Sequence, residues 1–172
     1  MTANWTDYVA GAILTAAQLN GVLDNFQDVA IFNEQQASGT NGGASTSGSY
    51  VKRTLNTTVV NNITSCSIAS SVISLPAGTY AVTAFAPSYL TSRNRLRLQN
   101  TTDGTTIALG QNSFSDGTQT AAVLQTVFTI TATKNFELQQ RFQTATATNG
   151  LGVACSFGDN EVYAQIQIAR IQ

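Results

Sequence analysis

Residues 75–110 constrain the fold most, because apolar and polar side chains alternate there along successive segments. After a Pro-Ala-Gly turn, residues 78–88 alternate with a period of two, which is typical of a half-buried strand. Residues 94–100 repeat the pattern, with leucines on one side and arginines on the other. Asp103-Gly104 then favours a tight turn onto residues 105–109, because Asp and Gly tolerate positive φ angles. This stretch predicts the middle of an antiparallel β-domain.

Similar runs predict strands through the rest of the C-terminal part. The predicted strands are residues 50–60, 66–75, 78–88, 94–100, 105–109, 121–132, 136–143, 151–157 and 162–171. Eight or nine strands at short intervals, with no helix among them, favour a sandwich or jelly roll. We therefore predict a mainly β fold: an antiparallel jelly-roll or β-sandwich domain over residues 50–172, preceded by an N-terminal arm and one α-helix.

The arm, residues 1–14, is apolar and holds the chain's single Trp. It either packs back on its own domain or docks on another protein. In the second case Trp5, Tyr8 and Leu14 are the expected anchors, since aromatic side chains are favoured at interfaces.

A helix is predicted from Thr15 to Gln36, because Thr15 and Gln18 match a capping box. Side chains spaced alternately three and four apart follow, as in a heptad seam. The seam comprises Leu19, Val22, Phe26, Val29, Asn33 and Gln36. It indicates either an amphipathic helix lying on its own sheet or a stem of three parallel helices, with Asn33 fixing the register.

Residues 37–49 are rich in Gly and Ser and show no periodicity, which is typical of a flexible linker. The predicted organisation is therefore an arm and helix over residues 1–36, a linker over 37–49, and a β-knob over 50–172.

Charged residues make up only 10% of the chain, and the net charge is -1. This balance argues against nucleic-acid and membrane-surface binding, which require a basic excess. The low charge also leaves little protection against self-association. We identify no signal peptide and no apolar run of roughly 20 residues, so we expect a chain made in the cytoplasm without a membrane span.

The sequence contains no histidine, which removes the usual Ser-His-Asp and Cys-His nucleophile systems and the commonest metal ligand. No phosphate-binding glycine loop is present. Cys66 and Cys155 either form one disulfide or, as is commoner in apolar runs, remain buried free thiols. The candidate acids of a glycosidase (Asp103, Asp116, Glu137, Asp159 and Glu161) mostly fall in turns. We therefore predict no catalytic, cofactor or metal site.

The one concentration of charge is Arg93, Arg95 and Arg97, which alternate on one strand face. They form either a solvated face or a contact with a partner, since Arg is enriched at interfaces. The full candidate partner face is Tyr89, Arg93, Asn94, Arg95, Arg97 and Asn112.

Several motifs occur here in an order that resembles a β-domain of tailed-bacteriophage virion proteins, of the tail-fibre or head-decoration type. They are Ala86-Pro87-Ser88-Tyr89, the basic strand from Arg93, the Asn100–Thr105 turn and the Thr148–Ala154 segment. The ILTAAQLN run from Ile13 also resembles the opening of such proteins. The sequence departs from the pattern at Gln140-Arg141, where the family has a histidine.

The domain is also similar to the trimeric jelly rolls of the tumour-necrosis-factor (TNF) and C1q type, which implies a homotrimer. The resemblance as a whole implies a non-enzymatic structural protein of the virion. The chain has no shaft repeats between its arm and its knob, which favours a capsid decoration or cement protein over a fibre. Its partners would be itself and the major capsid protein. The alternative is a short tail fibre whose knob binds a host surface glycan or protein. A polysaccharide depolymerase is a third hypothesis, which the few carboxylates and the absence of histidine disfavour.

Overall fold

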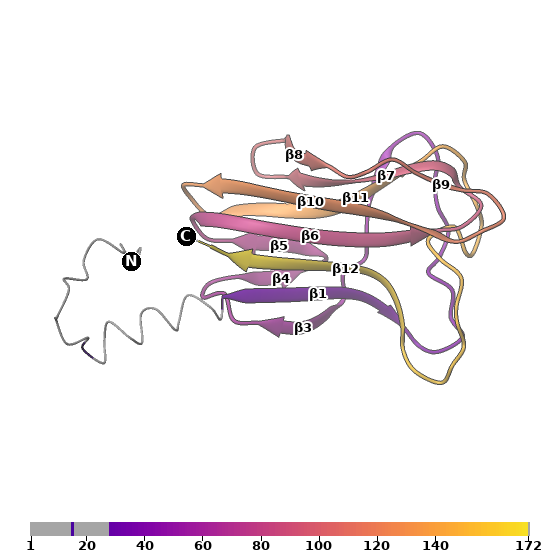
Figure 1. Cartoon of the computed structure of the whole chain (residues 1–172), viewed down its shortest axis with the longest axis horizontal. Helices are drawn as coiled ribbons and strands as arrows, with labels where there is room; N and C mark the ends of the chain where they lie inside the picture. Colours follow the sequence, from indigo (N-terminus) through magenta and orange to yellow (C-terminus); the bar gives the residue numbers. More distant parts are fainter. Residues whose placement is uncertain (1–14, 16–27, 172) are drawn as a thin grey trace.

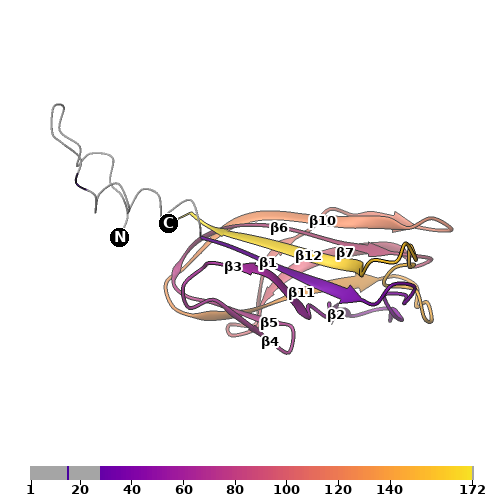
Figure 2. The same cartoon turned by 90° about the horizontal axis from the view of Figure 1, so that it is seen from below.

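The computed structural model describes residue 15 and residues 28–171, which build two antiparallel sheets packed face to face (Figures 1 and 2). The first sheet has the strand order β10-β6-β12-β1-β3. Its strands are β1 (Val29–Gln36), β3 (Thr57–Asn61), β6 (Gly78–Ser88), β10 (Thr120–Ile130) and β12 (Glu161–Arg170).

The second sheet has the order β4-β5-β11-β7-β8, with β2 paired to β11 and β9 paired to β7. Its strands are β2 (Tyr50–Lys52), β4 (Ser67–Ala69), β5 (Val72–Leu75), β7 (Ser92–Asn100), β8 (Thr105–Leu109), β9 (Ser113–Ser115) and β11 (Lys134–Phe142).

The core lies between the sheets and is made by alternate residues of the long strands. Strand β6 pairs along its whole length with β10, from Gly78 opposite Ile130 to Ser88 opposite Thr120. Its inward-facing residues Tyr80, Val82, Ala84 and Ala86 are almost fully buried, because the period-two pattern turns alternate side chains to the same face. The main buried side chains are Phe32, Leu75, Tyr80, Val82, Leu96, Leu98, Leu124, Phe136, Leu138, Ile166 and Ile168.

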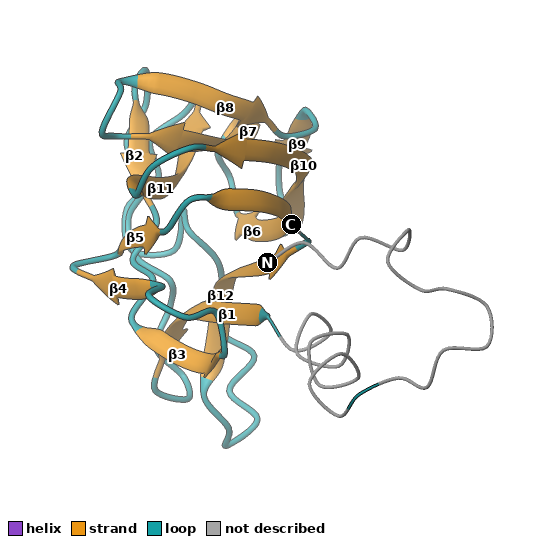
Figure 3. Cartoon of the chain, turned by 90° about the vertical axis from the view of Figure 1, so that its left-hand side faces the viewer, coloured by secondary structure: helices purple, strands orange, loops and turns teal. Residues whose placement is uncertain are grey.

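Several neighbouring strands in the sheets are far apart in the sequence, so the sheets are not built from consecutive hairpins alone. β1 lies beside β12, with Val29 opposite Ala169. Both the start of β1 and the end of β12 therefore lie at one end of the sandwich, which faces the viewer in Figure 3. The loops that follow β1, β6 and β11 gather at the opposite end (Figure 1).

The predicted helix through Gln36 is wrong over Val29–Gln36, which is strand β1. Ala30, Phe32 and Glu34 face the interior, and Asn33 accepts a hydrogen bond from Gln165 Nε2 at 2.9 Å. The pairing with β12 and β3 overrides the heptad spacing, so Val29 and Asn33 are sheet residues and not a helical seam. The other predicted stem residues (Leu19, Val22 and Phe26) and the predicted anchors (Trp5, Tyr8 and Leu14) lie outside the described residues.

The predicted flexible linker, residues 37–49, is instead an ordered loop held by backbone hydrogen bonds. Gly42 N–H donates to Gly152 O at 3.0 Å, and Ser45 N–H donates to Thr146 O at 2.9 Å. The carbonyl oxygen of Thr40 in this loop also accepts a hydrogen bond from the Tyr163 hydroxyl. The loop's partners lie mainly in the segment that follows β11, where residues 151–157 form a loop and not the predicted strand. The β-domain therefore begins at β1.

Most other strands are confirmed within one or two residues. Two predicted strands are each divided: residues 50–60 form β2 and β3 in opposite sheets, and residues 66–75 form the hairpin β4-β5. Both cysteines are free. Cys66 is buried as expected, whereas Cys155 is exposed because its segment is a loop.

Candidate functional site

An arginine-lined groove of about 810 Å³ lies on the outer face of the second sheet. Strand β7 supplies Arg93 and Arg95, β11 supplies Arg141, and β9 supplies Phe114. The full lining is Gly48, Tyr50, Arg93, Asn94, Arg95, Asn112, Ser113, Phe114, Arg141, Phe142 and Gln143. This lining contains three guanidinium groups and no carboxylate.

The strand register brings like charges together in the groove. Arg95 lies directly opposite Arg141, and Arg141 lies directly opposite Tyr50 on β2. Like charges in such positions destabilise a sheet. No described acid forms an ion pair with Arg93, Arg95 or Arg141. The sheet therefore presents positive charge that the described part of the protein leaves uncompensated.

Tyr50 holds two arginines in place. Its hydroxyl accepts a hydrogen bond from Arg95 Nη2 at 3.3 Å, and the guanidinium carbon of Arg97 lies 4.0 Å from the centre of its ring. That second contact is a cation-π interaction, which favours a fixed guanidinium position. Arg97 also donates to Gln139 Oε1 at 2.7 Å. Part of the basic face is thus held in position by contacts within the chain.

The charge is concentrated here although the chain as a whole is slightly acidic. The sequence has eight Lys and Arg residues. Those on this face are Lys52, Arg93, Arg95, Arg97 and Arg141. The other three are engaged elsewhere: Arg53 with Glu34, Lys134 with Asp103, and Arg170 with the carbonyl of Ala77. Glu137 neutralises part of the face through a 3.5 Å contact with Lys52, outside the groove lining.

The outer face of the first sheet has the opposite character, because the residues that line its hollow are uncharged. A shallow hollow of about 430 Å³ lies over β6, β10 and β12. Its lining is Ala81, Val82, Thr83, Gln125, Thr126, Val127, Gln167 and Ala169. Val127, on the edge strand β10, is 61% exposed, so this face presents apolar and amide groups to its surroundings.

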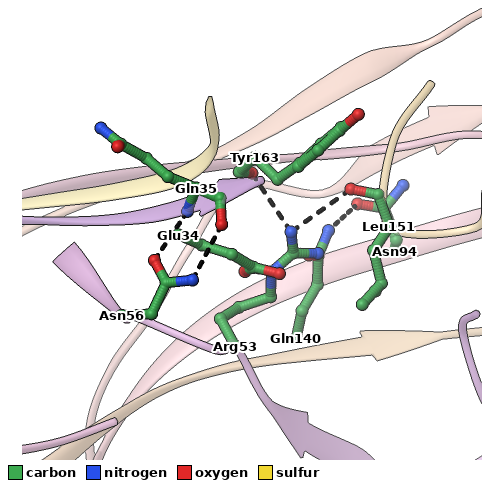
Figure 4. Close-up of polar contacts among 8 residues, drawn as sticks. All are labelled: Glu34, Gln35, Arg53, Asn56, Asn94, Gln140, Leu151 and Tyr163. Carbon is green, nitrogen blue, oxygen red and sulfur yellow. Dashed lines mark hydrogen bonds and ion pairs between the residues drawn. The ribbon is translucent and has the colours of Figure 1, made fainter. Parts of the chain in front are cut away.

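A buried polar network between the sheets supports both faces (Figure 4). Arg53 is fully buried and donates to Glu34 at 2.7 Å and to Gln140 at 3.1 Å. Gln140 in turn donates to Asn94 Oδ1 at 3.1 Å, on the strand that carries the groove arginines. Burial lowers the pKa of Arg53, and the neighbouring Glu34 carboxylate opposes that shift. The network fixes β7 and β11 from beneath.

The groove brings together four of the six predicted partner-face residues: Arg93, Asn94, Arg95 and Asn112. Asn94 is buried and Arg97 lies beside the lining on Tyr50. Tyr89 lies outside the lining, at the loop where its N–H donates to Gly150 O. The sequence reasoning missed Tyr50, Phe114 and Arg141. Only the departure from the family pattern at Gln140-Arg141 singled out one of these positions.

Two of the candidate carboxylates, Asp103 and Glu161, have structural roles. Asp103 accepts from Lys134 Nζ at 2.6 Å, which lowers the pKa of this carboxyl. Glu161 accepts from the backbone N–H groups of Gly39, Cys155 and Ser156, and these bonds lower its pKa. Within residue 15 and residues 28–171, no group of three or more His, Cys, Asp or Glu residues could hold a metal ion. The same residues include no helix long and apolar enough to span a membrane.

The sequence matches no protein-family model and no curated protein. Solved structures do match the fold. The globular domain of zebrafish complement 1qA matches with a TM-score of 0.51 and 16% identity, over 84% of this chain and 95% of that chain. Eiger TNF from S. frugiperda matches with a TM-score of 0.51 and 12% identity, over 84% and 92%. Both identities are low, so they show the fold alone: a TNF/C1q-like jelly roll.

The PRD1 vertex protein P5 also matches, with a TM-score of 0.49 and 15% identity, over 84% of this chain and 97% of that chain. That similarity is too low to support an inference about function.

Proposed function

We propose that this chain is a non-enzymatic structural protein of a bacteriophage virion, a homotrimeric β-knob that decorates and stabilises the capsid. The observation that carries the self-association is the uncharged outer face of the first sheet. The virion location is supported by the sequence motifs described above. The trimeric state is supported by the similarity of the β-domain to trimeric jelly rolls.

The outer face of the first sheet suits a contact between copies of the chain. Thr83, Gln125 and Gln167 can exchange hydrogen bonds across a contact, and Val127 and Ala169 supply apolar area. Depletion of charge is the compositional mark of an interface centre. A buried charge without a partner is costly, and burying this uncharged face would create none.

Attachment to the capsid falls to the part of the chain that precedes β1. Trp5, Tyr8 and Leu14 remain the proposed anchors, and Leu19, Val22 and Phe26 the proposed stem. The chain enters the knob where β1 begins, at the end opposite the loops that border the groove. The knob would then project outward from its anchor. Binding to the major capsid protein across neighbouring capsomers would stabilise the assembled shell, since a ligand stabilises the state that it binds.

The proposal is tested by the mass of the full chain in solution and by one charge placed on each sheet. The expected mass is three times the 18.1 kDa of one chain. Val127→Asp places a charge on the proposed contact and is expected to give monomers. Leu109→Asp places the same charge at a similarly exposed site on β8 of the other sheet, and this control is expected to remain trimeric. Monomeric wild-type protein would contradict the proposal.

A second candidate function keeps the fold and changes the role: a short fibre whose knob recognises a host surface glycan or protein. The arginine groove favours it, because a cement protein needs no such site. Quantitative mass spectrometry of purified virions separates the two candidates. Copy number in proportion to the major capsid protein indicates decoration, whereas copy number in proportion to a tail protein indicates a fibre.

A further inference from the structure

We infer that the arginine groove is a binding site for an anionic saccharide whose sugar rings carry carboxylates. The inference goes beyond the capsid role, since it requires only that the groove remain open in the assembled protein. It rests on the charge of the groove, on the occupied backbone of its floor, and on the mixture of side chains around it.

The charge of the groove favours an anion. Arg95 and Arg141 lie side by side, and the Arg93 and Arg141 side chains donate to no acceptor among the described residues. A guanidinium group is a planar fork of donors that fits a carboxylate through two parallel hydrogen bonds. An anionic ligand would remove the repulsion between Arg95 and Arg141 and satisfy the free donors at once.

Strands β7 and β11, which form the floor of the groove, offer no free edge to a peptide that adds as an extra strand. β7 pairs with β11 on one side and with β8 and β9 on the other. β11 likewise pairs with β7 and with β2. Peptide recognition by strand addition needs an unpaired strand edge. Since the edges of these two strands are occupied, a ligand that lies over them is held by side chains, which suits hydroxyl and carboxylate groups on a sugar.

The remaining lining matches a sugar ring. Phe114 is 56% exposed and lies directly opposite Arg93 in the β7-β9 pairing, so a ring that stacks on Phe114 has a guanidinium beside it. Asn112 and Gln143 are exposed amides at the rim, each able both to donate to and to accept from hydroxyl groups. The volume of about 810 Å³ lies within the usual range for ligand sites.

The groove lies away from the face proposed for the contact between copies. It lies on the outer face of the second sheet, whereas the proposed contact between copies lies on the outer face of the first sheet. The two proposals are therefore tested by substitutions on different sheets. Loss of saccharide binding with an intact trimer, or the reverse, identifies which of the two proposals has failed.

The test uses the full chain and tetragalacturonate, a four-ring saccharide with a carboxylate on each ring, in isothermal titration calorimetry at low salt. The control ligand is the fully methyl-esterified saccharide, which has the same sugar rings without the negative charges. Arg141→Gln removes one groove guanidinium, Phe114→Ser removes the stacking ring, and Lys134→Gln is the charge-matched control outside the groove. Thermal unfolding checks that each variant is folded.

We expect tetragalacturonate to bind and the methyl ester to bind at least about tenfold more weakly, because charged hydrogen bonds are lost. Arg141→Gln and Phe114→Ser should each weaken binding by about tenfold, whereas Lys134→Gln should not change it. No binding of tetragalacturonate would overturn the inference. Equal binding of inorganic phosphate, with no effect of Phe114→Ser, would reduce the groove to a simple anion site. Tighter binding of hexaglutamate than of the saccharide would assign it to an acidic peptide instead.

Discussion

Arg53 Nε donates a hydrogen bond to Glu34 Oε2 at 2.7 Å, and both side chains are almost completely buried between the sheets. The same guanidinium donates to Gln140 at 3.1 Å, to the Tyr163 carbonyl at 3.2 Å and to the Leu151 carbonyl at 3.3 Å. One side chain thus joins β1, β11, β12 and the loop after Thr148. No described buried side-chain polar atom lacks a partner, so the network is fully satisfied.

Replacing Glu34 is expected to destabilise the fold strongly. Glu34→Gln leaves the Arg53 charge buried without its counter-charge, which costs about 3–5 kcal/mol in comparable cases. Lys134→Gln removes the exposed ion pair with Asp103 and is expected to cost less than about 1 kcal/mol. Urea unfolding of both variants at one protomer concentration measures the difference. A cost for Glu34→Gln as small as that for Lys134→Gln would show that the pair is not a main support of the fold.

Gly152 is expected to tolerate no side chain. Its φ is +135°, and an added Cβ would lie 2.5 Å from Cδ1 of Tyr163, whose hydroxyl is fixed by the Thr40 carbonyl. Gly152→Ala should cost about 3 kcal/mol of unfolding free energy from backbone strain and overpacking together. Gly104→Ala has a positive φ but open space around it, so it should cost only about 1 kcal/mol. Equal losses of stability in Gly152→Ala and Gly104→Ala would mean that the loop around Gly152 can adjust to the added methyl group without penalty.

Glu161 should make the stability depend on pH. Hydrogen bonds from the backbone of Gly39, Cys155 and Ser156 lower its pKa below the ordinary 4.5. Its contribution is therefore complete above pH 4.5 and is lost as the pH falls through the lower folded-state pKa. The stability difference between wild type and Glu161→Gln, followed by urea unfolding across this range, should be constant at neutral pH and shrink in acid. A difference that grows in acid would contradict this assignment.

The two thiols should differ in reactivity. Burial raises the pKa of the Cys66 thiol to about 11, so very little thiolate is present near neutral pH, whereas Cys155 is exposed. Titration of the folded protein with a thiol-specific disulfide reagent should give one fast equivalent, and the second only on unfolding. Cys155→Ser should abolish the fast phase. A fast phase that survives in Cys155→Ser would show that the Cys66 region opens readily.

The alternating strands were predictable from sequence because one face of each is buried. β6 and β8 have the predicted bounds, and the Asp103-Gly104 turn lies between the predicted strands. β1 was not predictable, because its buried Glu34 suggests a solvated position and its partner Arg53 is supplied only by the folded structure. The ordered loop over residues 37–49 was missed for a similar reason, since its hydrogen bonds go to residues about a hundred positions away.

The candidate site was predictable only in part. The alternation of Arg93, Arg95 and Arg97 gives one strand of the groove directly from the sequence. Arg141 and Phe114 join it through the register of β11 and β9 against β7, which no local pattern reveals. The charge on one strand could therefore be recognised from the sequence. The groove around it could not, because it depends on how neighbouring strands pair in the sheet.

The most direct test of the central claim is the mass of a shortened chain that begins at Asp28, measured by sedimentation equilibrium. Such a chain keeps every strand of both sheets and removes the proposed anchor and stem. If the outer face of the first sheet makes the oligomer, the shortened chain is a trimer, and Val127→Asp converts it to a monomer. If the shortened chain is monomeric while the full chain is trimeric, the segment before β1 makes the trimer and the proposed contact on the first sheet is wrong.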